Sequence, residues 1–179
     1  MSVISQAAAM LTALSSPARL TLLCTVAERT AAGQDRSLAA VADALGLTVR
    51  ALVKEVARLE DCGLLTITGR TLSTDLAALT AASAALVAQL PVSALLDTQP
   101  DLWRYFVNGR LSELTVDHSV KLRLAPLLAR LLPDDRELTE AQVNEVLHQV
   151  HDDHAYLRRM LVEFGQLTRH GSAGYRRAG

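Results

Sequence analysis

The side chains best suited to chemistry in this sequence form a cluster of histidines and aspartates in its C-terminal third. His148, His151 and His154 recur every three residues, with Asp152 and Asp153 between them. Imidazole and carboxylate groups at this spacing could coordinate Zn²⁺ or another divalent cation. The same cluster falls in a predicted turn between two helices, where aspartate commonly caps the second helix. We prefer the turn interpretation, and we expect the protein to bind no metal ion and no cofactor.

Cations on a predicted helix over residues 49–62 suit contact with nucleic acid. Arg50, Lys54 and Arg58 lie on the face opposite the apolar residues of this helix. Arginine can pair bidentately with guanine, and lysine is well suited to phosphate. The alternative is a solvated face whose charge is balanced by Glu55 and Glu60. An arginine at the tip of the hairpin that follows completes the candidate DNA-binding residues of this part, which are Thr48, Val49, Arg50, Lys54, Arg58 and Arg70.

A further group of cations lies near the C-terminus. Residues 154–179 contain five arginines and one acidic residue, Glu163, with tyrosines and a histidine interleaved. This composition suits phosphate contact with occasional stacking on bases, and the alternative is a basic tail that keeps the protein in solution. Helical periodicity over residues 153–164 places Arg158 and Arg159 among the most exposed positions. The candidate DNA-binding residues of this part are Arg158, Arg159, Arg169, Arg176 and Arg177.

Composition limits the remaining classes of function. The chain has 179 residues, a formal net charge of -1 and two cysteines, Cys24 and Cys62, that lie far apart. A near-neutral chain does not attract nucleic acid through its overall charge, so any such binding must come from a local patch. We expect both cysteines to be reduced, buried hydrophobic residues of a cytoplasmic protein. The sequence contains no Ser-His-Asp, P-loop or similar catalytic pattern, and we expect no enzymatic activity.

Helices and a hairpin account for the first part of the chain. The sequence predicts helices over residues 3–14, 17–28, 38–45 and 49–62, the last two capped by Ser37 and Thr48. Two β-rich runs, LLTIT and TLSTD, flank Gly69 and Arg70 and predict a tight hairpin. A helix, a short turn, a second helix and a hairpin are typical of a winged helix-turn-helix.

The second part opens with a hairpin and then follows a similar order. Residues 103–116 predict two strands around a type I′ turn at Asn108 and Gly109. Further helices are predicted over residues 119–132, 140–150 and 154–164. Thr139 and Gln142 predict a capping box, and Asp152 or Asp153 caps the last helix. Residues 167–177 predict a second wing.

The two parts match each other without a gap at an offset of 102 residues. The aligned pairs include Val41 with Val143, Leu45 with Leu147, Leu59 with Leu161, and Gly63 with Gly165. Any two helix-turn-helix units share caps and apolar spacing, which is the alternative explanation. We interpret the match as a structural repeat.

Residues 76–96 carry no charge over a length close to that of a membrane span. The stretch is rich in alanine, contains Pro91 and lacks basic or aromatic anchors on its flanks. We therefore predict a buried helix over residues 76–90 and no membrane association. This helix and the helix over residues 3–14 carry more apolar surface than one small domain covers, which predicts a symmetric homodimer.

Two families resemble parts of the chain. The segments ALSSPARLTLLCTVAE and SLAAVADALGLTVRALVKEVARLEDCGLL resemble the ArsR-like winged-helix repressors over about residues 10–75. This resemblance implies a homodimer that binds palindromic operators and is released by an effector. The metal-sensing members carry a cysteine motif where this chain has VADAL, so the resemblance does not extend to thiolate metal sensing.

The C-terminal part is similar to another family. The segment EAQVNEVLHQVHDDHAYLRRMLVEFGQLTR, with YFVNGRLSEL upstream, resembles the domain of unknown function 2087, which is appended to bacterial transcriptional regulators. The resemblance implies an association with transcription, and it implies no ligand and no chemistry.

We expect a mainly α protein with small β wings, in which two winged helix-turn-helix domains are joined by an alanine-rich helix. The expected parts are a DNA-binding domain over residues 1–75, a linker or dimerisation helix over 76–99, and a second winged-helix-like domain over 100–179. The expected function is sequence-specific binding of double-stranded DNA by a homodimeric transcriptional regulator. Such a regulator could also respond to a small-molecule effector. The alternative is a protein-interaction, ligand-sensing or metal-sensing module whose second domain does not touch DNA.

Overall fold

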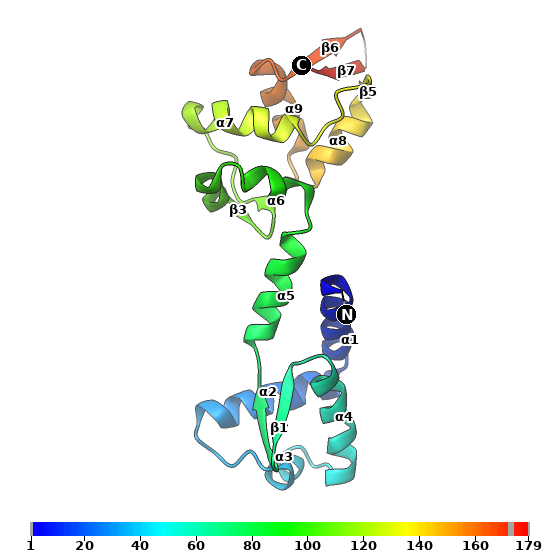
Figure 1. Cartoon of the computed structure of the whole chain (residues 1–179), viewed down its shortest axis with the longest axis vertical. Helices are drawn as coiled ribbons and strands as arrows, with labels where there is room; N and C mark the ends of the chain where they lie inside the picture. Colours follow the sequence, from blue (N-terminus) through cyan, green and yellow to red (C-terminus); the bar gives the residue numbers. More distant parts are fainter. Residues whose placement is uncertain (1, 172–173, 179) are drawn as a thin grey trace. The chain divides into compact units, whose positions relative to one another are not determined.

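The computed structural model describes residues 2–171 and 174–178. The protein is mainly helical with small antiparallel sheets, as the sequence predicts (Figure 1). The chain divides into two compact units, Met1–Leu86 and Val87–Gly179, and each is described below by itself. Residues 76–99, predicted as one connecting segment, contain two helices, one almost wholly in the first unit and the other in the second.

The first unit consists of helices and one hairpin. Its elements are α1 (Val3–Leu14), α2 (Pro17–Ala31), α3 (Leu38–Ala44), α4 (Val49–Asp61), β1 (Leu65–Thr68), β2 (Thr71–Thr74) and α5 (Ala77–Val87), whose last residue belongs to the second unit.

Local capping explains where the helices of the first unit begin. The hydroxyl oxygens of Ser2, Ser37 and Thr48 each accept a hydrogen bond from a backbone N–H in the first turn of α1, α3 and α4. Such caps satisfy donors that the helix itself cannot pair. Pro17 occupies the first position of α2, where its missing N–H costs nothing. The predicted caps of α3 and α4 are therefore present.

The apolar faces of these helices meet in a core that belongs to this unit alone. Leu52, Val56 and Leu59 of α4 are fully buried against Leu22 and Val26 of α2 and other apolar residues. Cys62 is buried in this core, as predicted. The prediction for Cys24 is wrong: it is exposed, because the neighbouring Leu22 and Leu23 turn the other face of α2 toward the core.

The hairpin of the first unit is attached to α3. Strands β1 and β2 pair antiparallel up to Thr68 and Thr71, and Gly69 begins the two-residue turn with φ of 66°. Glycine adopts this left-handed conformation without steric cost. An isolated bridge joins Ser37 to Thr71, and the Leu38 N–H donates to the carbonyl of Arg70 at 3.1 Å. The turn is thereby fixed against the start of α3.

The second unit has more elements and a three-stranded sheet. They are α6 (Pro91–Leu96), the 3₁₀ helix η1 (Pro100–Tyr105), β3 (Phe106–Val107), β4 (Arg110–Leu111), α7 (His118–Ala129), β5 (Leu138–Thr139), α8 (Glu140–His148), α9 (His154–Glu163), β6 (Leu167–His170) and β7 (Gly174–Arg177). The sheet has the order β5-β7-β6, and both pairings are antiparallel. The predicted second wing corresponds to β6 and β7, although its residues 172 and 173 lie outside the described residues.

The hairpin that opens the second part is much shorter than predicted. Its turn is as expected, because Asn108 and Gly109 have positive φ values of 50° and 76°, as a type I′ turn requires. Only two residues of each strand are paired, Phe106 with Leu111 and Val107 with Arg110. The residues before it form η1, in which the buried Leu102 packs into the core of this unit instead of extending a strand.

The predicted helix over residues 76–90 ends earlier, and a separate helix follows it. α5 ends at Val87, and Leu90 is extended, with φ of -72° and ψ of 140°, directly before Pro91 at the start of α6. Proline lacks an N–H and disfavours the helical conformation in the residue before it, which explains the break.

No single helix in the described part of the chain is long and apolar enough to cross a membrane. Taken together, α1 and α2 are long and apolar enough for a membrane span, but the chain bends by 94° between them.

The hydrogen bonds that end α4 and α9 repeat at the offset of 102 residues. The Leu64 N–H donates to the Leu59 carbonyl at 2.8 Å, and the Gln166 N–H donates to the Leu161 carbonyl at 2.8 Å. Gly63 and Gly165 follow these helices with φ of 80° and 68°. The gapless match continues into β1 and β6, and the second hairpin then has one more residue between its strands.

The starts of α4 and α9 do not correspond at this offset. α4 begins at Val49, whereas α9 begins at His154, three positions later than its counterpart would. The N-cap is Asp153, whose carboxylate accepts the Tyr156 N–H at 2.8 Å. The Asp153 N–H in turn donates to the His151 ring at 2.9 Å. These two hydrogen bonds lengthen the turn between α8 and α9 and shorten the helix.

Candidate nucleic-acid interface

The exposed face of α4 carries the cations that the sequence predicts. Arg50, Lys54 and Arg58 are all exposed, because the buried Leu52, Val56 and Leu59 turn the opposite face into the core. Within the described ranges, none of the three cations makes an ion pair or a side-chain hydrogen bond. Their charges are therefore available to an external partner.

The other two predicted residues of α4 lie at its start. Thr48 is exposed and its hydroxyl oxygen accepts the Ala51 N–H at 3.2 Å, so one acceptor position serves the cap. Val49 is 45% exposed. A side chain of this kind offers an apolar contact and no hydrogen bond, which suits a thymine methyl group.

Two acidic residues of α4 could balance the positive charge of this face, and one of them is paired with another helix. Glu55 forms an ion pair with Arg19 of α2 at 3.3 Å and is only partly exposed. The Arg19 Nε also donates to the carbonyl of Ala13 at the end of α1, at 2.7 Å. Glu55 therefore ties α4 to α2, whereas Glu60 and Asp61 at the end of α4 are exposed.

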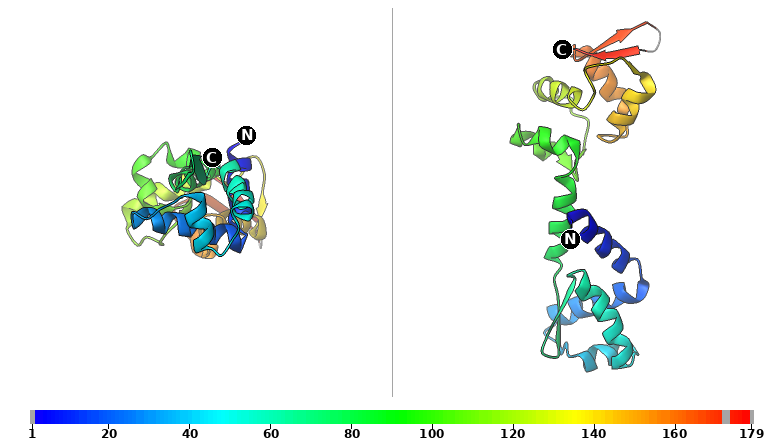
Figure 2. Two further views of the ribbon diagram at one scale, coloured as in Figure 1. Left: turned by 90° about the horizontal axis from the view of Figure 1, so that it is seen from below. Right: turned by 45° about the vertical axis from the view of Figure 1, so that its right-hand side comes forward.

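Arg70 lies at the tip of the β1–β2 hairpin and is exposed. Figures 1 and 2 show this turn at the same end of the first unit as α3 and the N-terminal end of α4. The structure thus brings Arg70, Thr48 and Arg50 to one end of this unit. A straight duplex presents phosphates on both sides of its major groove, so a helix and a hairpin tip at one end can contact it together.

The second unit has a hollow between α9 and its hairpin that gathers three of the predicted arginines. Arg158, Arg159 and Arg169 line it, together with acidic side chains from α8 and α9. Arg169 belongs to this face because it is paired in register with the buried Tyr175, and paired residues point to the same side of a sheet.

Arg158 does not lie on the exposed face where helical periodicity places it. Its side chain is only 15% exposed, and it forms an ion pair with Glu140 of α8 at 2.9 Å. It also donates a hydrogen bond to Asn144, and its guanidinium lies 5.8 Å from the centroid of the Tyr175 ring. The expectation of exposure is wrong because α8 and β7 cover this side of α9. Arg159, one position further, is exposed.

The two arginines at the end of β7 point to different sides of the sheet. Arg177 donates to the carbonyl of Leu132 at 3.0 Å and pairs with Asp134 at 3.0 Å. Arg176 is exposed, and no ion pair is found for it among the residues that the structure describes. Alternation along a strand separates neighbouring side chains in this way. Arg176 is thus available to a partner, and Arg177 holds β7 to the segment after α7.

The histidine cluster lies at the turn between α8 and α9, as the turn interpretation of the sequence predicts. The rings of His148 and His154 lie edge to face with centroids 5.6 Å apart, and the His154 Nδ1 is 3.0 Å from the carbonyl oxygen of Asp152. No group of three or more histidine, cysteine, aspartate or glutamate residues in the described part of the protein is arranged to hold a metal ion.

Sequence reasoning missed the residue that holds this turn. Arg110 of β4 pairs with Asp152 at 2.5 Å and donates to the carbonyl oxygens of His148 at 2.9 Å and Gln149 at 3.3 Å. The partners lie about forty positions along the chain, so no local pattern reports them. The only local signal is the position of Arg110 directly after the rigid Asn108–Gly109 turn.

The fold and these sites define a mainly helical protein of two units, each with exposed cations on one helix and one hairpin. Residues 107–177, from the end of β3 to the end of β7, match a family described as an uncharacterized protein conserved in bacteria (DUF2087). The matched range lies within the second unit and agrees with the resemblance seen in the sequence. It does not include the first unit, so the resemblance of residues 10–75 to ArsR-like repressors is still a prediction. No curated protein and no solved structure matches the chain.

Proposed function

We propose that the protein is a sequence-specific transcriptional regulator that binds double-stranded DNA as a homodimer in the cytoplasm. In this proposal α3 and α4 form a helix-turn-helix, with α4 as the recognition helix and β1–β2 as the wing. The order α7, β5, α8, α9, β6, β7 in the second unit is compatible with a second winged helix. The resemblance of residues 10–75 to ArsR-like repressors supports the assignment for the first unit.

The observation that carries the proposal is the exposed face of α4. Arg50, Lys54 and Arg58 lie on it without internal partners, although the chain as a whole is near-neutral. Holding unpaired cations on one side of a helix costs little in water and supplies phosphate and base contacts when DNA binds. A helix of this length also fits the major groove.

The dimer is supported by apolar surface on α1 and α5 that the first unit leaves uncovered. Ile4 and Leu11 of α1 are 59% and 66% exposed, and no residue of α5 is buried. A groove between the two helices is lined by apolar side chains, among them Met10 and Leu79. Apolar patches of this kind on a small domain mark an interaction surface. A second copy of the chain would cover them and would also present two recognition helices to a palindromic site.

The proposal is tested by measuring binding of the full chain to its own promoter DNA at several salt concentrations. We expect the logarithm of the binding constant to fall linearly with the logarithm of salt concentration, because phosphate contacts release counterions. An unrelated duplex of equal length is the specificity control. Equal affinity for both duplexes, or no binding at low salt, would contradict the proposal.

Light scattering of the same protein tests the assembly. We expect the mass of two chains at micromolar concentration. Replacing Ile4 and Leu11 together by serine is expected to shift the protein toward one chain, since both side chains lie on the exposed face of α1. A single-chain mass for the unmodified protein would remove the homodimer from the proposal.

A second candidate function concerns the second unit alone: it acts as a sensing or protein-interaction module that does not touch DNA. The observation in its favour is that Arg158 and Arg177 are paired inside the unit and contribute no free charge. The double substitution Arg159→Ala and Arg176→Ala distinguishes the two candidates in the full chain. A shallower salt dependence supports DNA contact by this unit, and an unchanged slope supports the module.

A further inference from the structure

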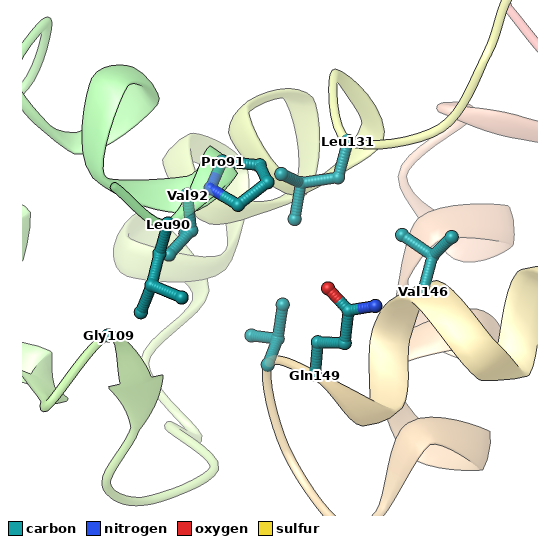
Figure 3. A pocket seen from close by; sticks show the side chains of 8 residues that line it. Leu90, Pro91, Val92, Gly109, Leu131, Val146 and Gln149 are labelled. Carbon is teal, nitrogen blue, oxygen red and sulfur yellow. The ribbon is translucent and has the colours of Figure 1, made fainter. Parts of the chain in front are cut away.

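The second unit contains a small apolar pocket that the proposed function does not use (Figure 3). Residues 90–92, at the start of α6, form one side of it, and Val146 of α8 lies on the opposite side. Leu131, after α7, and the side chain of Gln149, at the end of α8, complete the ring of side chains seen in Figure 3. Gly109 of the β3–β4 turn also lines the pocket.

The volume and lining of the pocket define the class of molecule that fits. The cavity measures about 130 Å³, and no charged side chain lines it. An apolar protein cavity of about 150 Å³ stays dry and accepts benzene. Pockets for drug-sized ligands and nucleotides are larger, from about 300 Å³ upward. An ionised ligand would find no charged partner in this lining, which favours a neutral molecule.

One polar group adds specificity to this apolar lining. The side-chain amide of Gln149 points into the space between Leu131 and Val146 (Figure 3). No hydrogen bond of this amide is found among the described residues, in which Gln149 accepts one from Arg110 through its backbone carbonyl. It can therefore donate to or accept from one polar atom of a bound molecule.

One wall of the pocket packs closely around Gly109. A Cβ atom at position 109 would collide with the Cδ1 of Leu90, and the φ of 76° also requires glycine or a strained residue. The facing wall is held by the Leu111 N–H, which donates to the Val150 carbonyl at 2.9 Å, and by the contacts of Arg110 with the end of α8. The backbone of this wall is thus held in place before a ligand binds, which lowers the entropy cost of binding.

We propose that this pocket binds a neutral, single-ring molecule that carries one hydroxyl or carbonyl group, of which phenol is the simplest example. The ring packs among Leu90, Leu131 and Val146, and the polar group pairs with the amide of Gln149. The β3–β4 turn and the segment after α8 both line the site, so a bound molecule would contact both. The inference concerns binding by the second unit, and it holds whether or not that unit contacts DNA.

The test is a titration of the full chain, labelled at leucine and valine methyl groups, with phenol and in parallel with toluene. We expect saturable shifts of the methyl signals of Leu90, Leu131, Val146 and Val150, with phenol binding the more tightly. Shifts that grow linearly and spread over methyl groups of both units would show unspecific partitioning. That result, or the absence of shifts at these methyl groups, would overturn the proposal.

Two variants locate the site. Val146→Phe fills the cavity and is expected to weaken phenol binding at least tenfold, whereas Leu122→Phe, on an exposed position of α7, leaves it unchanged. Gln149→Leu alters an exposed residue and preserves the fold. It is expected to weaken phenol about fivefold, the loss of one neutral hydrogen bond, and to leave toluene unaffected. Equal affinities of the unmodified protein and Val146→Phe, or a parallel loss of phenol and toluene in Gln149→Leu, would also overturn the proposal.

Discussion

Arg50 and Lys54 lie one turn apart on the exposed face of α4, and we expect them to contribute to DNA binding in different ways. A guanidinium can read a guanine edge through two hydrogen bonds, whereas an ammonium acts mainly as a point charge on phosphate. Arg50→Ala is expected to cost about 1–3 kcal/mol of binding free energy on the specific site. Lys54→Ala is expected to weaken specific and unspecific duplexes alike. Fluorescence anisotropy on both duplexes measures the difference.

Arg130→Ala serves as the matched control for these two substitutions. Arg130 is exposed at the end of α7 in the second unit and is not one of the candidate residues, and its loss changes net charge by the same amount as either single substitution. Operator affinity that is unchanged in the Arg50→Ala, Lys54→Ala double variant would remove α4 from the DNA interface.

Arg158 and Arg159 are neighbours in the sequence, and we expect them to have opposite roles. Arg158 forms an ion pair and a hydrogen bond with α8 and lies over the Tyr175 ring, while Arg159 is exposed. Arg158→Ala is expected to lower the free energy of unfolding by about 1–3 kcal/mol, because charged hydrogen bonds are lost from a partly buried position. Arg159→Ala is expected to change stability by less than about 0.5 kcal/mol, as is usual for exposed positions.

Urea denaturation followed by the fluorescence of Trp103, which lies in the second unit, measures both changes. Arg158→Lys is the control, since it keeps the charge but not the planar fork that contacts Glu140 and Asn144. Equal stabilities of the Arg158→Ala and Arg159→Ala variants would show that the internal contacts of Arg158 carry no net stabilisation.

At the level of elements, an ion pair joins η1 to α7 and gives the second unit a pH dependence. Arg123 of α7 donates to both carboxylate oxygens of Asp101 and to the side chain of Gln99. The hydrogen bond from Arg123 holds the pKa of the Asp101 carboxyl below its usual value. A carboxyl with a lowered pKa stabilises the fold above its unfolded pKa, about 3.9, and this contribution is lost as the pH falls through the folded pKa.

We therefore expect Asp101→Asn to lower the melting temperature at pH 7 and to have a progressively smaller effect as the pH falls below about 3.9. Thermal melts of Asp101→Asn and the unmodified protein across this pH range measure the difference. Asp135→Asn is the matched control, because Asp135 is exposed and no ion pair is found for it in the described residues. A constant difference between Asp101→Asn and the unmodified protein at all pH values would show that the ion pair does not stabilise the contact.

At the level of the whole molecule, the two units have separate hydrophobic cores. Leu59 is fully buried in the core of the first unit, and Leu161, its counterpart at the offset of 102 residues, is fully buried in the core of the second. Truncating either side chain to alanine is expected to cost about 2–5 kcal/mol in the unit that contains it. Because Trp103 packs against the core of the second unit, its fluorescence reports on the unfolding of that unit.

Leu161→Ala is accordingly expected to shift the denaturation midpoint seen by Trp103 fluorescence. Leu59→Ala is expected to leave that midpoint in place and to lower the midpoint of helical circular dichroism. If both variants shift the fluorescence midpoint equally, the two units unfold as one cooperative body, and the prediction of independent cores fails.

The sequence by itself determined the features that depend on neighbouring residues. Thr48 and the Thr139–Gln142 pair cap their helices as predicted, and Asn108 and Gly109 form the predicted turn. The repeat at an offset of 102 residues also predicted equivalent helix ends at Gly63 and Gly165. These features follow from side-chain and backbone preferences within a few residues, which a sequence displays directly.

Only the tertiary structure decided which cations are free and where an apolar pocket forms. Arg158 is largely buried because it pairs with Glu140 of α8. Arg110 holds the turn between α8 and α9, whose residues lie 38 to 42 positions further along the chain. The pocket takes one wall from α6 and another from α8, which are far apart along the chain. Helical periodicity reports which side of one helix is apolar, but it does not report which other element packs against that helix. That choice depends on how the elements of each unit pack, and it separates charges used inside the fold from charges available to a partner.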